Sequence, residues 1–350
     1  MATLYVTEIG TQVRKVGERL VLVKGQEVLE EIPLPEIDQV VMMGQSVSLT
    51  TAALFALTRR GVDIVYLTGA GRRAAHVMGP EHKHGRLRHM QSLMVAQPEN
   101  AMALAGAIVQ GKINNQRTLV RRHTERAPWA AAALAGMDAM AKRINQARTL
   151  DELRGLEGQA AKEYFSLFRR LLARPRDGAD WGFERRAYYP PTDPINAMLS
   201  FGYTLLLNDM VSACTMVGLD AYLGCFHAID YGRPSMALDL IEEFRPVIVD
   251  SLVLDMVNHG QLGLHDFQER RPEEDDDKQA AGEQTTRPIY LTDAGRKKFL
   301  TGYAERVNEL AAAPSSGQRT TFKRMFQLQA QATARVILGE TNTYVPLMMR

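Results

Sequence analysis

The chain has 350 residues, of which 45% are hydrophobic, and its formal net charge is +2 at pH 7. This length favours two domains with sizeable cores, and no apolar run is long enough to cross a bilayer. The start MATLYVTEIG lacks the pattern of a secretory signal, and Cys214 and Cys225 are too few for a disulfide framework, so we expect a cytoplasmic protein that does not associate with a membrane.

Residues 1–78 predict a β-rich domain. Short segments rich in β-branched residues are TLYVTEIG, QVRKV, RLVLVKG, VLEEIPL and QVVMMG, and the turns KVGERL and KGQEV suit meandering antiparallel strands. SLTTAALFALTRRG predicts one helix, capped by Ser48 or Thr50, and VDIVYLTG predicts a buried strand. We therefore expect a small β-sandwich-like domain that carries no catalytic residue.

The rest of the chain predicts helices. GPEHKHGRLRH is polar and rich in turn residues, which indicates a hinge over residues 79–95. Over residues 96–350, apolar residues recur at three- and four-residue spacing, as in LRGLEGQAAKEYFSLFRRLLA. Residues 272–288, PEEDDDKQAAGEQTTRP, are charged and predict a mobile loop. The expected fold class is α+β, with a small β-sandwich-like domain followed by a larger all-α domain.

An acidic helix is predicted within residues 235–246. Ser235 would be its N-cap and Pro246 would end it, which places Asp239, Glu242 and Glu243 together on one side. Such a side is typical of a solvated helix face. Carboxylates this close repel one another unless water, a cation or a metal offsets their charge, so the same pattern also suits a metal site.

His227 precedes this helix in the apolar segment LGCFHAIDYG, where a lone imidazole is more often a packing residue than a ligand. The turn YGRPS would fold His227 back toward the acidic helix, and one more ligand would then complete a site for a divalent ion. Glu157, in RGLEGQAAKEYF, is the best candidate because its small neighbours let another helix or a nucleic-acid backbone approach, with Tyr164 two turns further on the same face. The alternative for Glu157 is a tightly packed, Ala-rich helix seam.

Four segments, in this order and at fitting intervals, resemble the Cas-one family, the CRISPR-associated integrase that inserts new spacers into the CRISPR array. They are GLEGQAAKEYF, DPINAMLSFGYTLL, GLDAYLGCFHAIDYGRPSMALDLIEEFRP and YLTDAGRKKFL. The resemblance implies a β-rich dimerisation domain, a hinge and a helical catalytic domain in a prokaryotic protein. The site residues that it implies are the catalytic metal ligands Glu157, His227 and Glu242, with Asp239 as an outer or alternate ligand and Tyr164, Asn196 and Arg245 as supports.

Two carboxylates with one imidazole suit Mg²⁺ or Mn²⁺, and the nitrogen ligand favours Mn²⁺, whereas non-haem iron usually takes two histidines and one carboxylate. Such an ion can neutralise charge that develops on a phosphodiester and lower the pKa of a bound hydroxyl. The resemblance implies that the 3′-hydroxyl of incoming DNA attacks a repeat-border phosphodiester by transesterification. With water as the attacking group, the same site would act as a metal-dependent endonuclease.

Basic clusters predict a DNA-binding surface, although an ordinary basic surface is the alternative for any one of them. The candidates are Lys112, Arg117, Arg121, Arg122 and Arg126 along one helix, and Arg185 and Arg186 beside Tyr188 and Tyr189. Arginines mixed with aromatic rings can contact phosphates and stack on bases.

Two further motifs are weak. His76, His82, His84 and His89 crowd the hinge, but their spacing is irregular and no cysteine accompanies them, which argues against zinc. Cys225 lies close to His227 in sequence, yet buried cysteines are usually small packing residues rather than nucleophiles.

The sequence therefore predicts a metal-dependent DNA integrase and endonuclease of CRISPR adaptation. The resemblance implies a homodimer, with two such dimers bridged by a dimer of the Cas-two protein and with prespacer and repeat DNA as substrates. The alternative is a non-catalytic dimeric DNA-binding scaffold whose acidic site is vestigial.

Overall fold

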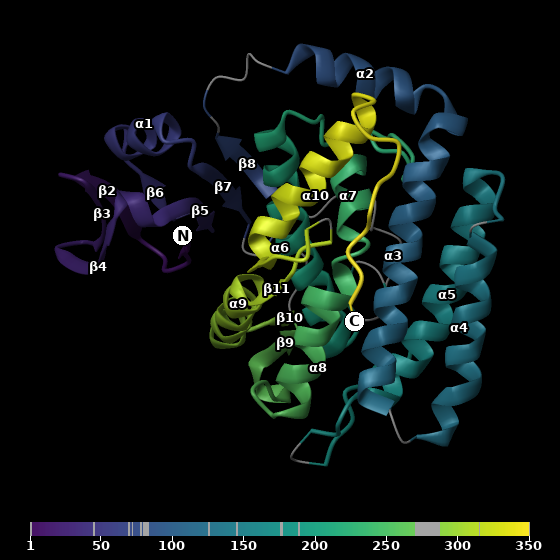
Figure 1. Cartoon of the computed structure of the whole chain (residues 1–350). Helices are drawn as coiled ribbons and strands as arrows, with labels where there is room; N and C mark the ends of the chain where they lie inside the picture. The colour runs from purple at the N-terminus through teal and green to yellow at the C-terminus, as the bar shows by residue number, and fades with distance from the viewer. Residues whose placement is uncertain are drawn as a thin grey trace. The chain divides into compact units, whose positions relative to one another are not determined.

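The computed structural model of the chain describes residues 2–44, 46–68, 71, 73–77, 79, 84–124, 127–144, 146–175, 178–187, 190–269, 288–314 and 316–349. The chain divides into two compact units, Met1–His84 and Gly85–Arg350. Strands dominate the first unit and helices the second, so the predicted α+β class is confirmed (Figure 1). Residues 272–287 of the predicted mobile loop lie outside the described residues.

Two four-stranded sheets and one helix form the first unit. The strands are β1 (Ala2–Val6), β2 (Thr11–Val16), β3 (Arg19–Lys24), β4 (Glu27–Pro33), β5 (Ile37–Met43), β6 (Ser48–Leu49), β7 (Asp63–Leu67) and β8 (Arg73–Val77), and the helix is α1 (Thr51–Arg59). The sheet orders are β1-β5-β7-β8 and β4-β3-β2-β6. The antiparallel run β2–β3–β4 matches the predicted meander.

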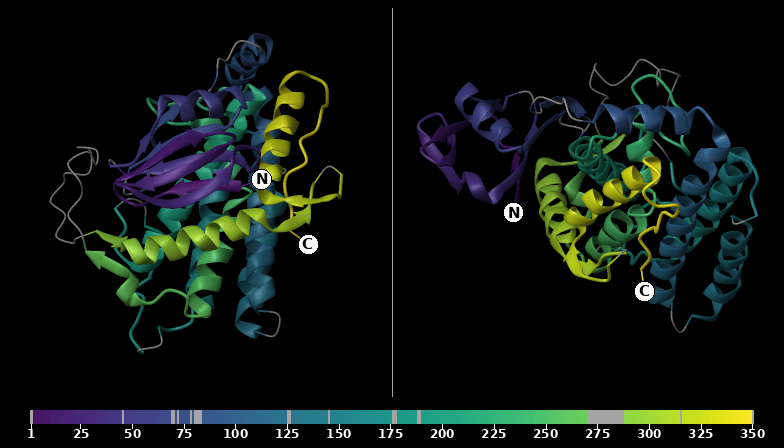
Figure 2. Two further views of the ribbon diagram at one scale, coloured as in Figure 1. Left: turned by 90° about the vertical axis from the view of Figure 1, so that its left-hand side faces the viewer. Right: turned by 45° about the horizontal axis from the view of Figure 1, so that its top comes forward.

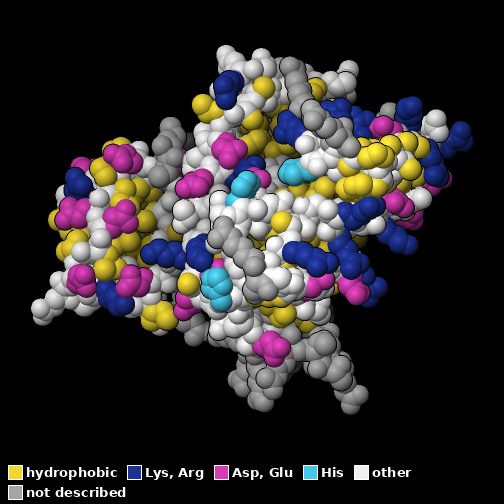
Figure 3. All heavy atoms as spheres, turned by 90° about the horizontal axis from the view of Figure 1, so that it is seen from below, with side chains coloured by type: hydrophobic (Ala, Val, Ile, Leu, Met, Phe, Trp, Pro, Cys, Tyr) yellow, Lys and Arg dark blue, Asp and Glu magenta, His cyan; other side chains and the backbone are white. Residues whose placement is uncertain are grey.

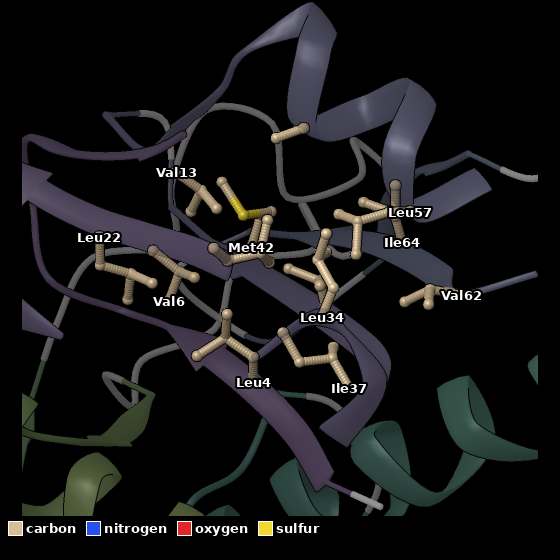
Figure 4. Packing of buried hydrophobic residues seen from close by; sticks show 13 residues of the cluster. Leu4, Val6, Val13, Leu22, Leu34, Ile37, Met42, Leu57, Val62 and Ile64 are labelled. Atoms are coloured by element: carbon tan, nitrogen blue, oxygen red, sulfur yellow. The ribbon is translucent and has the colours of Figure 1, made fainter. Parts of the chain in front are cut away.

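The first sheet departs from that meander, since β1, β5 and β7 are parallel neighbours. Parallel strands need a long crossover, and α1 supplies one between β5 and β7. Alternating apolar residues are compatible with either direction of pairing, so the local pattern predicted the strands but not this topology. Side chains of both sheets, among them Val6, Leu22 and Met42, share one core with Leu57 of α1 (Figure 4).

The second unit is a helical body with two small hairpins. Its helices are α2 (Gly85–Val95), α3 (Pro98–Thr124), α4 (Ala131–Ile144), α5 (Leu150–Leu171), α6 (Pro194–Val217), α7 (Ser235–Ile241), α8 (Ser251–Asn258), α9 (Asp293–Asn308) and α10 (Phe322–Ile337). The hairpin strands are β9 (Phe267–Glu269), β10 (Ile289–Leu291), β11 (Leu310–Ala312) and β12 (Arg319–Thr321). These three-residue strands are too short to give a periodic signal in the sequence.

Residues 85–95, predicted as the second half of a hinge, form helix α2 instead. The side chain of Gln91 is buried and donates to the backbone carbonyls of Asp220 and Leu223 at 2.8 and 2.9 Å. The same side chain accepts the N–H of Asp220 at 2.9 Å. These bonds attach α2 to the loop that follows α6, so this part of the predicted hinge is packed structure.

Helix α6 passes through the centre of the second unit and is buried along most of its length, which explains its almost uniformly apolar sequence (Figure 2). Helices α3 and α5 pack against each other beside it. Within the described part of the chain, no helix combines the length and the hydrophobicity that crossing a membrane would require.

Candidate active site

The three carboxylates of the acidic helix are buried, so they do not form the solvated face that the sequence suggested. The exposed fractions of Asp239, Glu242 and Glu243 are 0%, 2% and 0%. Burial of an ionised carboxylate is costly unless hydrogen bonds or opposite charges offset it. Each of the three has a separate set of partners, and each therefore serves a different purpose.

The ends of this helix also differ from the prediction. Ser235 is the first residue of α7 rather than its cap, and its hydroxyl donates to the carbonyl of Ala228 at 2.8 Å. Pro246 does not end the helical path, because a π-helical stretch, Arg245–Asp250, leads directly into α8. Proline is tolerated at the start of this stretch, where its missing N–H removes no interior hydrogen bond.

Asp239 fixes the position of His227. One carboxylate oxygen of Asp239 accepts the N–H groups of Cys225 and Phe226 at 2.6 and 2.9 Å. The other oxygen accepts the N–H of His227 at 2.8 Å and contacts Nδ1 of the imidazole at 2.6 Å. With Nδ1 as the donor to this oxygen, Nε2 of the neutral imidazole carries the lone pair that can bind a ligand.

Gly224 makes this arrangement possible. A Cβ at this position would lie 2.6 Å from Cβ of Ser235 and 2.8 Å from Oδ2 of Asp239. The loop therefore approaches the start of α7 so closely that only glycine fits.

Glu242 and Glu157 share a lysine. The Lys112 ammonium from α3 lies 2.5 Å from Oε2 of Glu242 and contacts Oε1 of Glu157 from α5. Arg245 lies 3.4 Å from Oε1 of Glu242, and Nε2 of His227 lies 3.8 Å from the same oxygen. Of the three predicted ligands, Glu157 and Glu242 therefore share one ammonium, and His227 lies beside Glu242.

The charges at this site shift the pKa values of its members. Burial alone would raise the pKa of Glu242, but Arg245, Lys112 and His227 outweigh it and hold the pKa below its usual value. Burial alone would lower the pKa of Lys112, but Glu242 and Glu157 reverse this effect and raise it. Near neutral pH, the site therefore holds an ionised carboxylate and a charged ammonium.

Arg154, which the sequence did not single out, ties the Glu157 helix to the His227 loop. Its guanidinium donates to the carbonyl of Phe226 from Nε at 3.1 Å and from Nη2 at 2.7 Å. Arg154 lies one turn before Glu157 on α5, and Phe226 directly precedes His227. The sequence shows only that Arg154 and Glu157 lie one turn apart on the same helix. It does not show that Arg154 bonds the carbonyl of Phe226.

The predicted supports Tyr164 and Arg245 lie beside a further buried carboxylate, Asp250. The hydroxyls of Tyr164 and Tyr203 donate to Asp250 at 2.6 and 2.5 Å, and the Arg245 guanidinium lies 4.7 Å from the centre of the Tyr203 ring. Burial raises the pKa of Asp250 to about 6, although both hydroxyls favour its ionised form. This network fixes the π-helical stretch that follows Glu242.

Asp250→Asn is expected to change how stability depends on pH. Burial raises the pKa of Asp250 in the folded state from 3.8 to about 6. The contribution of wild-type Asp250 to the free energy of unfolding is therefore fully present below about pH 4 and is lost as the pH rises through about 6. The substitution removes this loss, so urea unfolding should show the variant gaining up to about 3 kcal/mol on wild type between pH 4 and 7. The exposed Asp151→Asn serves as the control, and equal pH profiles for the two variants would contradict the prediction.

Asn196, the remaining predicted support, bonds the side chain of Asp193 and holds the loop of residues 185–187. Its amide donates to the carbonyl of Arg185 at 2.9 Å and accepts the N–H of Ala187 at 3.0 Å and a guanidinium N–H of Arg186 at 2.8 Å. Arg186 in turn lies over the Tyr203 ring. Asn196 therefore acts on the site through this loop.

The predicted DNA-binding residues separate into two groups. Lys112 is 7% exposed and belongs to the carboxylate site, Arg117 pairs with Asp138, and Arg186 is bound by Asn196. Exposed members are Arg121, Arg122 and Arg185, whereas Arg126, Tyr188 and Tyr189 lie outside the described residues. On the face shown in Figure 3, basic side chains alternate with acidic ones instead of forming one uniform patch.

The two weak motifs have structural partners. Cys225 is buried and its pKa stands well above the usual value because of burial, so the thiol stays protonated and is a poor nucleophile. His76 in β8 pairs with Asp63 in β7. Within the described part of the chain, His84 and His89 belong to no group of three possible metal ligands, and His82 lies outside that part.

The donor set fits a hard divalent cation, with Lys112 in the corresponding place. Among the described residues, no three His, Cys, Asp or Glu side chains already stand at metal-binding geometry. Instead, the Lys112 ammonium lies between the Glu157 and Glu242 carboxylates. A position that stabilises one positive charge between two carboxylates, with an imidazole nitrogen nearby, has the ligand chemistry of a Mn²⁺ or Mg²⁺ site.

The sequence matches a known protein family and curated relatives over nearly its whole length. The family model described as "CRISPR associated protein Cas1" matches residues 4–305. A "CRISPR-associated endonuclease Cas1 2" of Rhodospirillum rubrum is 38% identical over 355 residues, covering 98% of this chain and 97% of the relative. A Cas4/Cas1 exonuclease–endonuclease fusion of Geobacter sulfurreducens is 34% identical over 99% of this chain, which spans 60% of the fusion.

Solved structures share the fold. A "Casposase bound to integration product" matches with a TM-score of 0.81 and 21% identity, covering 99% of this chain and 93% of the casposase. A "Cas6-RT-Cas1--Cas2 complex" matches with a TM-score of 0.78 and 21% identity, covering 99% of this chain and 36% of the longer one. The family match over most of the sequence and the relative at 38% identity show that the chain belongs to the CRISPR associated protein Cas1 family.

Proposed function

We propose that the chain is a metal-dependent DNA integrase and endonuclease of CRISPR adaptation. It would join the 3′-hydroxyl ends of captured DNA to the CRISPR repeat by transesterification and would cut DNA when water replaces the hydroxyl. The observation that carries the proposal is that the Lys112 ammonium contacts both Glu157 and Glu242, while Nε2 of His227 lies 3.8 Å from Glu242. The chain has relatives named endonucleases, and the similar casposase was solved with an integration product.

Glu157, Glu242 and Nε2 of His227 would hold Mn²⁺ or Mg²⁺. The bound ion would neutralise charge at the reacting phosphodiester and lower the pKa of the attacking hydroxyl. Asp239 has both oxygens engaged by the His227 loop, which favours its predicted role as an outer partner over that of an alternate ligand. Since Lys112 contacts both glutamates, a divalent ion would compete with its ammonium for them.

The proposed partners are DNA, a second copy of this chain and a protein of the Cas2 kind. The complex of a Cas1-containing chain with Cas2 supports the last of these, and the casposase complex supports DNA. The exposed Arg121, Arg122 and Arg185 are the candidates for phosphate contacts, because a guanidinium at the surface can replace counterions on DNA. We expect the protein to act in the prokaryotic cytoplasm, where the CRISPR array lies.

A non-catalytic DNA-binding scaffold is the second candidate. The observation that favours it is Lys112, whose ammonium contacts both glutamates. A scaffold would bind branched or repeat-bearing DNA without cutting or joining it, and chelation would have no effect on it.

Glu157→Ala tests the proposed site, with Glu163→Ala, an exposed carboxylate on the same helix, as its matched control. We expect Glu157→Ala to weaken Mn²⁺ binding by at least roughly tenfold in titration calorimetry and to abolish strand joining and nicking, because a ligand and a negative charge are lost. Glu163→Ala should match wild type in both measurements.

The same assay separates the two candidates. Wild type with Mn²⁺ should join and nick a repeat-bearing DNA, and EDTA should stop both reactions. Activity that survives both EDTA and Glu157→Ala would mean that the assigned site is wrong. DNA binding without any cutting or joining by wild type would establish the scaffold.

A further inference from the structure

The segment Tyr344–Met349, here called the strap, lies against Asn115 of α3 and Glu243, next to the proposed site. It follows α10 and runs beside α3 and α7, in yellow in Figures 1 and 2. Glu243, the third buried carboxylate of the acidic helix, receives it. Oε2 of Glu243 accepts the N–H of Leu347 at 2.7 Å, and Oε1 accepts the hydroxyl of Tyr344 at 2.7 Å.

Two further buried amides complete this junction. Asn115 of α3 donates to the carbonyls of Glu243 and Leu347 at 2.7 and 2.8 Å and accepts the N–H of Met349 at 2.7 Å. Gln329 of α10 donates to Oε1 of Glu243 at 2.9 Å and to the carbonyl of Val345 at 3.1 Å. The strap is therefore bound through its backbone and the Tyr344 hydroxyl, by side chains that come from three different helical segments.

Gly111 provides the space for the strap. A Cβ at residue 111 would lie 2.7 Å from Cβ of Pro346 and 3.4 Å from Cβ of Glu243. Since real Cβ contacts are never this short, the strap and α3 approach as closely as they do only because residue 111 is glycine. Gly106, on the same helix, has nothing within 4 Å of an added Cβ.

Three of the residues that receive the strap, Gly111, Asn115 and Glu243, flank residues of the proposed site. Gly111 directly precedes Lys112, and Asn115 lies one turn after it on α3. Glu243 directly follows Glu242. The strap therefore joins the two backbones, from α3 and from the end of α7, that carry the Lys112–Glu242 ion pair.

We propose that the strap is a positioning element of the active site, which sets the spacing between Glu242 and Lys112 by joining Glu243 to α3. The expected effect on Mn²⁺ binding rests on the proposed function, whereas the effect on the spacing between Lys112 and Glu242 does not. With the strap in place, Glu242 is held where it can meet Glu157 and His227. When the strap is released, Asn115 still donates to the carbonyl of Glu243, but the links that run through Leu347 are lost. The end of α7 then moves more freely against α3, and Lys112 becomes accessible.

Gly111→Ala tests the proposal, and Gly106→Ala is the matched control. Three quantities are measured on the full chain, namely hydrogen exchange at Leu347 and Met349, the rate at which acetic anhydride modifies Lys112, and the Kd for Mn²⁺. In Gly111→Ala we expect faster exchange, Lys112 modification accelerated by roughly tenfold and Mn²⁺ binding weakened by roughly tenfold. In Gly106→Ala all three should match wild type.

Tyr344→Phe provides a milder variant, because it removes only the hydroxyl that donates to Glu243. It should change the same quantities in the same direction by a smaller factor, and it keeps the test open if Gly111→Ala does not fold. Faster strap exchange in a folded variant, with Lys112 modification unchanged, would overturn the inference and leave the strap a purely structural element.

Failure of the proposed function gives a different result. If wild type binds no Mn²⁺, the metal site is wrong, whereas the Lys112 modification rate still reports whether the strap sets the spacing of α3 and α7. If wild type binds Mn²⁺ and strap release leaves its Kd unchanged, the metal site stands and the positioning role is refuted.

Discussion

His227→Ala is expected to reduce strand joining and nicking by roughly 100-fold or more while DNA affinity changes by less than about twofold. The imidazole presents Nε2 toward Glu242, 3.8 Å from Oε1, and its other nitrogen is fixed by Asp239. Its removal takes away the one nitrogen ligand of the proposed site. DNA affinity should remain because it depends mainly on contacts between basic residues and phosphates.

The measurement combines single-turnover joining kinetics in Mn²⁺ with a filter-binding titration at fixed salt. His265→Ala, which removes an exposed histidine, should leave both quantities at the wild-type level. An equal loss of binding and of joining in His227→Ala would show that His227 contacts DNA rather than the reacting centre, and the assignment would fail.

Much of the fold could be predicted because its signals are local. Thr50 caps α1 by accepting the N–H of Ala53, as its sequence position suggested, and Thr149 and Asp193 do the same for α5 and α6. The parallel pairing of β1 with β5 and β7 was not predictable in this way, because strand direction depends on connections between distant segments rather than on alternation.

The site was predictable only in part, for a related reason. Helical periodicity placed Asp239, Glu242 and Glu243 on one side, but periodicity cannot show what covers that side. The partners of Glu243 include Leu347, 104 positions away, and those of Asn115 include Met349, 234 positions away. A carboxylate is solvated or buried according to such partners, so the solvated interpretation was wrong.

The surroundings of Lys112 could not be predicted from the sequence either. Within RTLVRRHTER and its surroundings it looks like one more member of a basic helix, and it was therefore grouped with the DNA-binding residues. It faces Glu157 and Glu242 only because α3, α5 and the end of α7 pack together. The four motifs that resemble the family gave the proposed ligands, but they contained no information about the lysine between them.

Asp239→Ala is expected to have the largest effect on stability, lowering the free energy of unfolding by about 3 kcal/mol or more, because it leaves the buried N–H groups of Cys225, Phe226 and His227 without their acceptor. Asp230→Ala, at an exposed carboxylate of the same loop that accepts the N–H of Tyr231, should cost less than about 1 kcal/mol. Asp239→Asn should lie between them, since it retains one carbonyl oxygen as an acceptor. Urea unfolding measures all three, and a cost for Asp239→Ala no greater than that for Asp230→Ala would contradict the prediction.

The carboxylate of Asp239 also contacts Nδ1 of His227 and so orients the imidazole. Mn²⁺ binding should therefore weaken by roughly tenfold in Asp239→Asn and stay unchanged in Asp230→Ala, when both are measured at a temperature where both variants are folded. Loss of stability without any loss of Mn²⁺ affinity would separate the structural role of Asp239 from its role in orienting the imidazole.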